Sequence, residues 1–384
     1  MKLLILYWMR LIMPGKKIRL SKSAIGKEEK AAVSEVLEKE YLGMGEEVRL
    51  FEEEIKDYLQ TDKEVVCVNT GTSALHLALS ALDIKEGDEV LVPSLTYVAS
   101  FQAISACGAT PVAVEIDEAT LFIDIDDAKN KITANTKAIM PVHYASNARL
   151  MNSVYELAKS YDLRVVEDAA QAFGCKREGK FVGQEGDVIC FSFDGIKNIT
   201  SGEGGAILSS DPRLIQRVQD GRLLGVQKDT QKRFSGQRSW NFDVENQGFR
   251  YHMSNIMAAI GREQLKKIAQ FGDKRKAIAR MYIKELQNIS QVCVLDFDFD
   301  EIIPHIFVIK AQNRDALRNY LLDDNIECGI HYKPNHLLSK YKTANHLPKT
   351  EKVYKEILTL PCHVDLTQDE QARVIQTIKD FYNV

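Results

Sequence analysis

Short apolar segments alternate with segments of helical periodicity between about residues 25 and 210. This alternation limits the possible fold more than any other feature of the sequence. Segments of strand character lie at 64–68, 89–92, 111–116, 138–142, 163–167, 188–193 and 206–208. Segments of helix character lie between them, at 47–60, 73–82, 97–106 and 150–161. Strands separated by helices predict an α/β fold in which a mostly parallel sheet, covered by helices on both faces, forms a large domain.

The chain changes character in its last third. A long helical stretch covers 254–286, with a break expected near Phe271-Gly272. Beyond it, 302–311 and 327–332 have strand character and 314–322 has helix character, which predicts a smaller α+β unit. We therefore expect three parts, packed closely because no flexible linker is visible: an N-terminal extension at 1–17, a large domain at 18–270 and a small C-terminal domain at 271–384.

Composition argues against several classes of partner. The formal net charge of the 384 residues is −4 and no long basic block occurs, so nucleic-acid binding is not expected. The seven cysteines are scattered without a Cys-x-x-Cys pair, and the histidines share no metal-ligand spacing with them. We expect reduced thiols, a cytoplasmic location and no metal site.

The N-terminal segment MKLLILYWMRLIMPGKK has a basic start and an apolar run, as a signal peptide would. Arg10 interrupts the run, no small-residue cleavage site follows, and the run is shorter than the ~20 apolar residues of a membrane helix. Neither secretion nor membrane insertion is expected. Met13 is an alternative start of the protein, and a short amphipathic extension packed on the protein is the other interpretation.

Polar residues follow several expected strands, at the edge of the sheet where α/β proteins bind ligands. The segment 69–74, NTGTSA, runs from a strand into a helix whose free amides and hydroxyls could hold a phosphate. Its spacing matches neither a Walker loop nor a dinucleotide fingerprint. Simple capping of the helix by Thr72 or Ser73 is the alternative.

Three further side chains belong to the same edge. Asp168 ends a buried strand, where a carboxylate is costly unless it is paired, and a helix N-cap is the alternative. Lys197 lies between an apolar strand and the loop Gly202-Glu203-Gly204-Gly205, and taken alone it would be a solvated lysine. Tyr97 could cover the same crevice with its ring, or it could pack in the core.

Together, a phosphate cradle, a buried carboxylate, an aromatic ring and a lysine are the groups that pyridoxal 5′-phosphate (PLP) requires. The lysine forms a Schiff base with the cofactor aldehyde. A carboxylate beside the pyridine nitrogen keeps that nitrogen protonated, so that the ring can act as an electron sink. The combination therefore predicts a PLP enzyme.

At this point the chain resembles a known family, the PLP-dependent nucleotide-sugar aminotransferases of fold type I (DegT/StrS-like), from about residue 18 onward. Six segments carry the resemblance through their order and spacing: NTGTSALHLAL (69–79), VPSLTYVAS (92–100), VVEDAAQAFG (165–174), FSFDGIKNITSGEGGAI (191–207), MSNIMAAIGREQL (253–265) and LPCHVDLT (360–367).

The resemblance implies a role for each matching position. Lys197 would be the Schiff-base lysine, Asp168 would bind the pyridinium nitrogen, and Gln171 would bind the phenolic oxygen. The remaining cofactor contacts would be Thr72, Ser73 and Ser192 to the phosphate and Tyr97 stacked on the ring. The resemblance also implies a homodimer in which the partner chain completes each site.

The chain departs from the family pattern in two places. Relatives often carry Asn-Tyr-Arg in the segment that touches the neighbouring phosphate, whereas this chain has Arg250 and His252 at the outer positions. Arg250 could still reach the phosphate, and a surface ion pair is the alternative. Asp194 stands where a histidine or aromatic residue is usual. It could raise the pKa of the lysine, or pair with Arg250 or with a sugar hydroxyl.

A stretch of the small domain, GIHYKPNH, matches residues that line the sugar pocket in relatives. The resemblance therefore implies substrate contacts from His331, Tyr332 and His336, and ordinary packing of a turn is the alternative.

The implied reaction moves an amino group from L-glutamate to a nucleotide-linked keto sugar, for surface polysaccharide or glycan biosynthesis. The GEGG loop favours amination at carbon 4 of a 4-keto-6-deoxyhexose over carbon 3. A sugar dehydratase of the same fold would have histidine in place of Lys197. A non-catalytic sensor of PLP or nucleotide sugars would not need Lys197, Asp168 and Gln171 together. A PLP-dependent amino-acid lyase would need an arginine clamp that the sequence does not locate.

Overall fold

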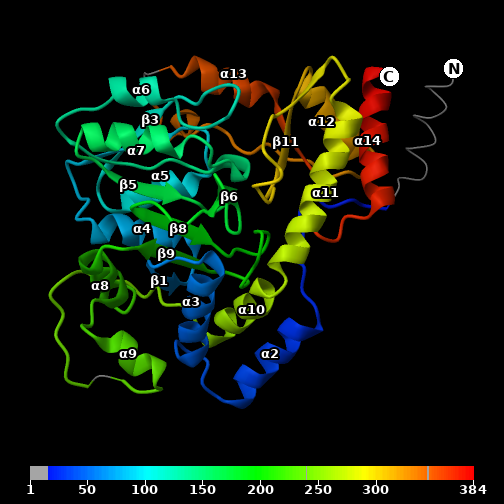
Figure 1. The fold of residues 1–384 in the computed structure, drawn as a ribbon. Coiled ribbons are helices and arrows are strands. Elements are labelled where there is room, and N and C mark those ends of the chain that lie inside the picture. Colours follow the sequence, from blue (N-terminus) through cyan, green and yellow to red (C-terminus); the bar gives the residue numbers. More distant parts are fainter. Residues whose placement is uncertain (1–15, 239, 344–345) are drawn as a thin grey trace.

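The computed structural model describes residues 16–238, 240–343 and 346–384. A seven-stranded sheet lies between two layers of helices in the larger part (Figure 1). In spatial order its strands are β1 (Glu64–Val68), β9 (Gly205–Ser209), β8 (Val188–Ser192), β5 (Arg164–Asp168), β4 (Thr136–Ile139), β2 (Glu89–Pro93) and β3 (Thr110–Val114). Of these seven strands, β9 alone runs against the direction of the other six, so the predicted α/β fold with a mostly parallel sheet is confirmed.

Residues that alternate along a strand face opposite layers of helices. Val66 and Val68 pack in one apolar cluster with α4 (Gly71–Ala81), α5 (Val98–Ala106) and α8 (Pro212–Gly221). Val65 and Cys67 pack on the other face with α3 (Glu46–Leu59) and α10 (Asn255–Leu265). The second layer continues over the sheet with α6 (Ile125–Asn130) and α7 (Met151–Ser160). Burial on both faces explains why the strands are almost wholly apolar.

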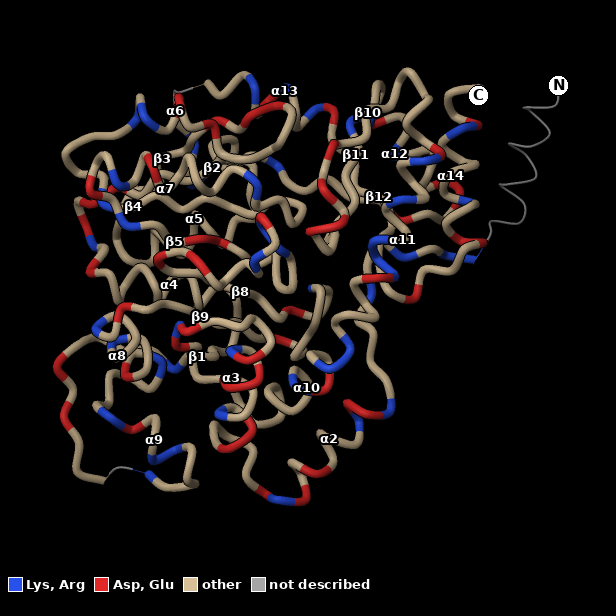
Figure 2. Tube along the Cα trace, in the orientation of Figure 1, with Lys and Arg blue, Asp and Glu red and all other residues tan. Residues whose placement is uncertain are grey.

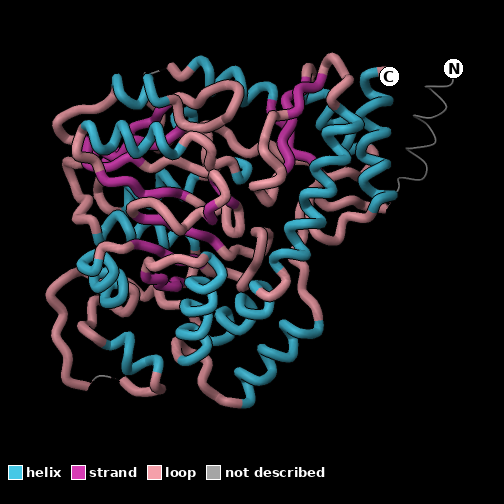
Figure 3. Tube along the Cα trace, viewed as in Figure 1, coloured by secondary structure: helices cyan, strands magenta, loops and turns pink. Residues whose placement is uncertain are grey.

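The smaller part holds an antiparallel sheet in the order β10 (Val292–Val294), β11 (Phe307–Ala311), β12 (Ile357–Leu360). Three helices pack beside this sheet: α11 (Ile268–Leu286), α12 (Arg314–Asp323) and α14 (Gln368–Tyr382) (Figures 1 and 3). The predicted division near residue 270 falls inside α11 and stays a prediction. Ile18 exchanges backbone hydrogen bonds with Asn325 and Glu327, so the start of the described chain pairs with this smaller part.

The remaining elements are short or peripheral: α2 (Lys27–Glu38), α9 (Asp229–Phe234), α13 (Pro348–Glu356), the β6–β7 hairpin (Lys176–Arg177 and Lys180–Phe181) and the 3₁₀ turns η1 (Tyr144–Ser146) and η2 (Asn335–Leu337). Acidic and basic residues are interspersed along the trace of both parts (Figure 2). Within the described ranges, no helix combines the length and the apolar character needed to span a membrane. The expectations for 1–15 lie outside the described residues.

Two predicted details are wrong. The break in the long helical stretch lies at Lys266-Lys267, between α10 and α11, and not at Phe271-Gly272. Gly272 is inside α11, where an added Cβ would lie 2.9 Å from the Ile303 side chain, so this glycine permits close packing and does not end the helix. The segment 327–332 is not a strand, because its only ladder contact is the bridge between Gly329 and Thr359.

Candidate active site

A cavity of about 410 Å³ opens at the carboxyl ends of the parallel strands, between the two parts of the molecule. Segments from distant parts of the chain line it: Thr70–Thr72 after β1, Thr96, Tyr97 and Ala99 after β2, Val142 after β4, Asp168, Ala170 and Gln171 at β5, Ser192, Asp194, Ile196, Lys197 and Glu203 around the β8–β9 connection, and His305, His331 and Tyr332 from the smaller part. The cavity therefore lies where an open α/β sheet is expected to bind its ligand.

Lys197 enters the cavity from the loop between β8 and β9. That loop is fixed by its neighbours, since Asn198 donates to the Phe173 carbonyl at 3.0 Å and the Ser201 amide donates to the Phe193 carbonyl at 2.9 Å. The Lys197 Nζ atom makes no hydrogen bond to any residue that the structure describes. Burial lowers the pKa of Lys197 from its ordinary value, and the charge of Asp168 opposes this shift without cancelling it. A less protonated amine is a better nucleophile.

Asp168 is the last residue of β5 and is only 5% exposed. One carboxylate oxygen, Oδ2, accepts a hydrogen bond from Ser100 Oγ at 2.6 Å, and Oδ1 accepts one from the Ala170 amide at 3.2 Å. The backbone on both sides is fixed, because the Asp168 amide donates to Pro141 and its carbonyl accepts from His143. The buried carboxylate is therefore hydrogen-bonded, as a buried charge must be, and still lines the cavity.

Gln171 lies three residues further on and is also buried. Its Oε1 accepts from the Ala145 amide at 2.8 Å, and its Nε2 donates to the Tyr332 hydroxyl at 3.3 Å. The amide group is thus oriented by η1 on one side and by the smaller part on the other. This arrangement leaves the Nε2 side of Gln171 available to a ligand that replaces or joins Tyr332.

The start of α4 forms an anion cradle with the end of β8. Thr72 is exposed and Ser192 is buried, and both line the cavity. Gly71 lets the helix approach the strand closely, because an added Cβ would lie 2.7 Å from the Ser192 Cβ. The first amides of an α-helix have no intrahelical acceptor, so they point at any anion held here.

Ser73 does not line the cavity. Its hydroxyl donates to Asn69 Oδ1 at 2.6 Å, and its amide donates to Thr70 Oγ1 at 3.0 Å. The N-cap of α4 is therefore Thr70, and neither Thr72 nor Ser73 has that role. Ser73 supports the shape of the cradle from behind.

Aromatic and histidine side chains form the side of the cavity that faces the smaller part. The Tyr97 ring is exposed and lies 5.5 Å from the Tyr332 ring, measured between centroids. His331 Nδ1 lies 2.8 Å from Thr359 Oγ1, and burial, helped by the Lys197 charge, lowers the pKa of His331 to about 4. The imidazole of His331 is therefore neutral at physiological pH.

Besides Ser73, two predicted site residues lie outside the cavity. His336 is 2% exposed, and its ring contacts Ser94 Oγ at 2.7 Å and Glu351 at 3.3 Å, so it joins the turn to the protein. Arg250 is exposed on the segment before α10 and forms a backbone bridge with Leu223. Asp194, in contrast, lines the cavity beside Lys197.

The sequence interpretation assigned no role to two titratable side chains of the cavity, Glu203 and His305. Glu203 was used only as part of a loop pattern, yet it faces the cavity, and burial raises its pKa with a further contribution from Asp194. His305 is 4% exposed, and its Nδ1 has no hydrogen-bond partner among the described residues. Burial and the nearby charge of Lys197 lower the pKa of His305 well below its usual value. In the sequence, the one indication of such a role was that His305 is a single histidine within the apolar stretch IIPHIFVI.

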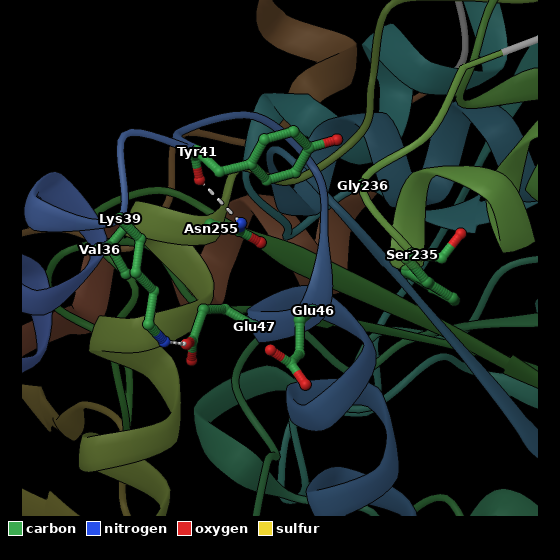
Figure 4. Close-up of a pocket in the computed structure, with 9 residues that line it drawn as sticks. Val36, Lys39, Tyr41, Glu46, Glu47, Ser235, Gly236 and Asn255 are labelled. Carbon is green, nitrogen blue, oxygen red and sulfur yellow. Dashed lines mark hydrogen bonds and ion pairs between the residues drawn. The ribbon is translucent and has the colours of Figure 1, made fainter.

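A second cavity, of about 360 Å³, lies between the start of α3 and the segment that follows α9. Figure 4 shows Glu46, Glu47 and Asn255 on one side of it, with Ser235 and Gly236 opposite. Its lysine, Lys39, is paired with Glu47 at 3.2 Å. Without an unpaired nucleophile, this cavity is not the candidate for catalysis.

The residues of the first cavity fit PLP. An unbonded lysine, a hydrogen-bonded carboxylate and an anion cradle with two hydroxyls lie around one space, and Gly71 allows the start of α4 to lie close to Ser192. PLP, when bound, supplies an electron sink that stabilises negative charge on the carbon next to the transferred nitrogen. For metals, no group of three or more His, Cys, Asp or Glu side chains suited to an ion occurs in the described ranges.

Comparisons with known proteins agree with this chemistry. GDP-perosamine synthase of Escherichia coli O157:H7 is 37% identical over 366 residues, which cover 94% of this chain and 97% of that protein. Among solved structures, S. venezuelae DesV in complex with a ketimine intermediate has a TM-score of 0.85 at 33% identity, covering 93% of this chain and 95% of that one. Helicobacter pylori PseC, an aminotransferase of pseudoaminic acid biosynthesis, has a TM-score of 0.88 at 27% identity, covering 96% and 100%.

A profile of the DegT/DnrJ/EryC1/StrS aminotransferase family matches residues 23–379, which is nearly the whole chain. The resemblance noted in the sequence is thereby confirmed, and PLP is the cofactor of this family. The chain belongs to the DegT/DnrJ/EryC1/StrS family of PLP-dependent sugar aminotransferases.

Proposed function

We propose that the protein transfers the amino group of L-glutamate to carbon 4 of a nucleoside-diphosphate-linked 4-keto-6-deoxyhexose, for polysaccharide or glycan synthesis. The observation that carries the proposal is the unbonded Lys197 amine in a cavity that also holds Asp168 and the anion cradle. An amine at this place can accept a proton from one carbon and return it to another, which is the proton transfer that amino exchange requires.

In this proposal each cavity residue has one task. Asp168 holds a proton on the ring nitrogen of PLP, Gln171 contacts the phenolic oxygen, and Tyr97 covers the ring. Thr72 and Ser192 hold the phosphate, and Ser73 keeps the cradle in shape. These assignments are supported by the positions of the side chains around one cavity of about 410 Å³.

The sugar would lie on the side of the smaller part. His331 and His305 are neutral there and can donate or accept hydrogen bonds, while Asp194 and Glu203 can accept from sugar hydroxyls. The position of Glu203 in the cavity supports a role for the GEGG loop in selecting carbon 4 over carbon 3. His336, which lies behind the cavity, would act only by holding the turn that carries His331 and Tyr332.

The relatives support the class of substrate. The name GDP-perosamine synthase describes a product that is an amino sugar joined to a nucleoside diphosphate. We infer the same class of substrate here and a cytoplasmic location, since all seven cysteines are free thiols.

We also propose a homodimer with shared sites. Leu224, Phe242, Val244 and Trp240 are exposed, and Trp240 is 88% accessible. The segment that carries the last three joins α9 to α10 along the outer edge of the larger part (Figure 1). Large apolar side chains on one exposed segment are typical of an interface. Arg250, on the same segment, would then reach the phosphate cradle of the partner.

The first test is an absorbance spectrum of purified protein with PLP, before and after L-glutamate is added. A yellow band that forms with PLP and bleaches with L-glutamate is the expected result, and the K197A variant should show neither change. A band that glutamate leaves unchanged would refute the amino donor, and no band at all would refute the role of Lys197. Loaded protein should then aminate one of a panel of UDP-, dTDP- and GDP-linked keto sugars, with the position read by NMR of the product. Amination at carbon 3 would refute the proposed position.

A further inference from the structure

A chain of two hydroxyl groups, neither of which has a role in the proposed function above, leads to the Asp168 carboxylate. Ser100 Oγ donates to Asp168 Oδ2 at 2.6 Å, and Thr96 Oγ1 lies 3.0 Å from Ser100 Oγ. The three side chains are 5% exposed or less. Thr96 precedes α5 and Ser100 lies in its first turn, so their spacing of four residues places both on one side of the helix start.

The direction of these hydrogen bonds follows from the number of protons. An ionised carboxylate can only accept, so the single hydroxyl proton of Ser100 is committed to Asp168. The contact between Thr96 and Ser100 must then use the proton of Thr96. Both hydroxyls therefore donate toward the carboxylate, and hydrogen bonds to an ionised group are stronger than those between neutral groups.

A residue of the smaller part, Asn335, fixes the backbone of the segment that carries Thr96. Asn335, which is fully buried, donates its Nδ2 to the Thr96 carbonyl at 2.8 Å and its amide to the Ser94 carbonyl at 2.9 Å. The segment that carries Thr96 is thereby tied to η2, three residues after Tyr332 of the cavity. The Asp168 carboxylate thus has an anchor independent of its own strand.

We propose that Ser100 and Thr96 are positioning residues, which fix the rotation of the Asp168 carboxylate so that it stays directed at the ring nitrogen of the cofactor. The inference rests on the proposed function, in which Asp168 contacts that nitrogen. Without the Ser100 hydroxyl, Oδ2 would have no side-chain donor, and only the Ala170 amide, 3.2 Å from Oδ1, would oppose rotation of the carboxylate away from the ring. Neither residue touches the reacting atoms in this proposal.

The test uses full-length protein loaded with PLP that carries ¹⁵N in its ring. The ¹⁵N resonance reports the proton on the ring nitrogen, and the dissociation constant of PLP is measured beside it. In S100A we expect the resonance to move toward its unprotonated position and PLP to bind about tenfold more weakly, the effect of one hydrogen bond to a charged group. In T96V, which keeps the shape of threonine, a smaller shift in the same direction is expected, and T96S should keep the wild-type resonance.

A matched control lies on the same helix. Ser105 Oγ of α5 donates to the Phe101 carbonyl at 3.0 Å and lies 3.2 Å from the Tyr341 hydroxyl, away from Asp168, so S105A loses a hydroxyl without disturbing the chain of hydroxyls at Asp168. Its resonance should equal that of the wild type. If S100A and T96V lower only the melting temperature and leave resonance and affinity unchanged, the two hydroxyls merely pack and the inference is wrong. A wild-type protein without a protonated ring nitrogen would instead overturn the role of Asp168, and the inference with it.

Discussion

At the residue scale, the buried amine of Lys197 is expected to lower the stability of the folded protein. It is largely withdrawn from water and has no hydrogen-bond partner among the described residues. Such groups persist because function needs them, and their replacement by an apolar side chain often stabilises a fold. The lysine should therefore lower the stability of the protein without cofactor.

The K197M variant tests this in the cofactor-free protein, by chemical denaturation between pH 7 and 10.5. Because the pKa of Lys197 is lowered in the folded state, the unfolded chain binds the proton more tightly, and wild-type stability should rise as the pH approaches the ordinary value of 10.5. K197M should lack this part of the rise and be more stable by about 1 kcal/mol at pH 7. Equal stability of both proteins at all pH values would contradict the expectation.

A second residue prediction concerns Arg222, which is fully buried. It contacts Glu52 at 2.5 Å and the Cys67 carbonyl at 2.7 Å, and burial raises the pKa of Glu52 despite the pairing. R222M leaves that carboxyl without its charged partner, with only the Cys67 amide as donor, and should lower the free energy of unfolding by about 3–5 kcal/mol. The double variant R222M/E52Q should regain much of the loss in urea denaturation. A double variant as unstable as R222M would show that packing of the arginine matters more than its charge.

At the element scale, the contact between α4 and β8 shapes the anion cradle. G71A adds a methyl group 2.7 Å from the Ser192 Cβ, so helix and strand must separate. We expect the affinity for PLP to fall about tenfold, as for the loss of one charge-assisted hydrogen bond. Equilibrium dialysis measures it, and G43A is the control because an added Cβ there meets nothing within 4 Å. Unchanged affinity in G71A would mean that the helix start does not hold the phosphate.

The elements differ in how far the sequence predicted them. The strands of the large sheet were found because burial on both faces makes them short and uniformly apolar, as in β1 and β8. The helix break was misplaced because glycine has two uses, and only the distance from Gly272 to Ile303 distinguishes close packing from a helix end. The segment 327–332 was predicted as a strand, but whether it pairs depends on β12, and the two are joined only by the bridge between Gly329 and Thr359.

The candidate site divides in the same way. Asp168 ends β5 and Lys197 lies in the loop that follows β8, so chain order alone brought them to one edge of the sheet. Ser100 and His305 acquire their surroundings from segments more than 60 residues away, such as β5 for Ser100. Such contacts leave no periodic signal in the sequence. Ser73 lies in the first turn of α4, and the direction of its side chain there places its hydroxyl against Asn69 and not in the cavity.

At the scale of the whole molecule, the proposed dimer predicts complementation between chains. K197A and R250A should each be nearly inactive, but a mixture refolded together should regain about a quarter of the wild-type rate, since half of the dimers then hold one intact site. The measurement is the rate of amino transfer beside the mass from sedimentation. A dimer without recovery would show that Arg250 serves its own chain, and a monomer would refute the shared site.

The reversed direction of β9 has a consequence for how the molecule is assembled in time. Because β9 returns beside β8, Ser192 is paired with Gly205, and the chain between them closes a short loop that carries Lys197. Short loops lose little entropy on closing, whereas Thr72 and Asp168 meet only after segments distant in the chain have paired. Lys197 thus lies in the loop closed by the strand pairing of shortest sequence separation in the large sheet. The residues around it, such as Thr72 and Asp168, come from segments distant in the chain. A partly folded chain can already hold Lys197 in its loop. The groups that determine which molecule reaches this lysine come together only in the fully folded protein.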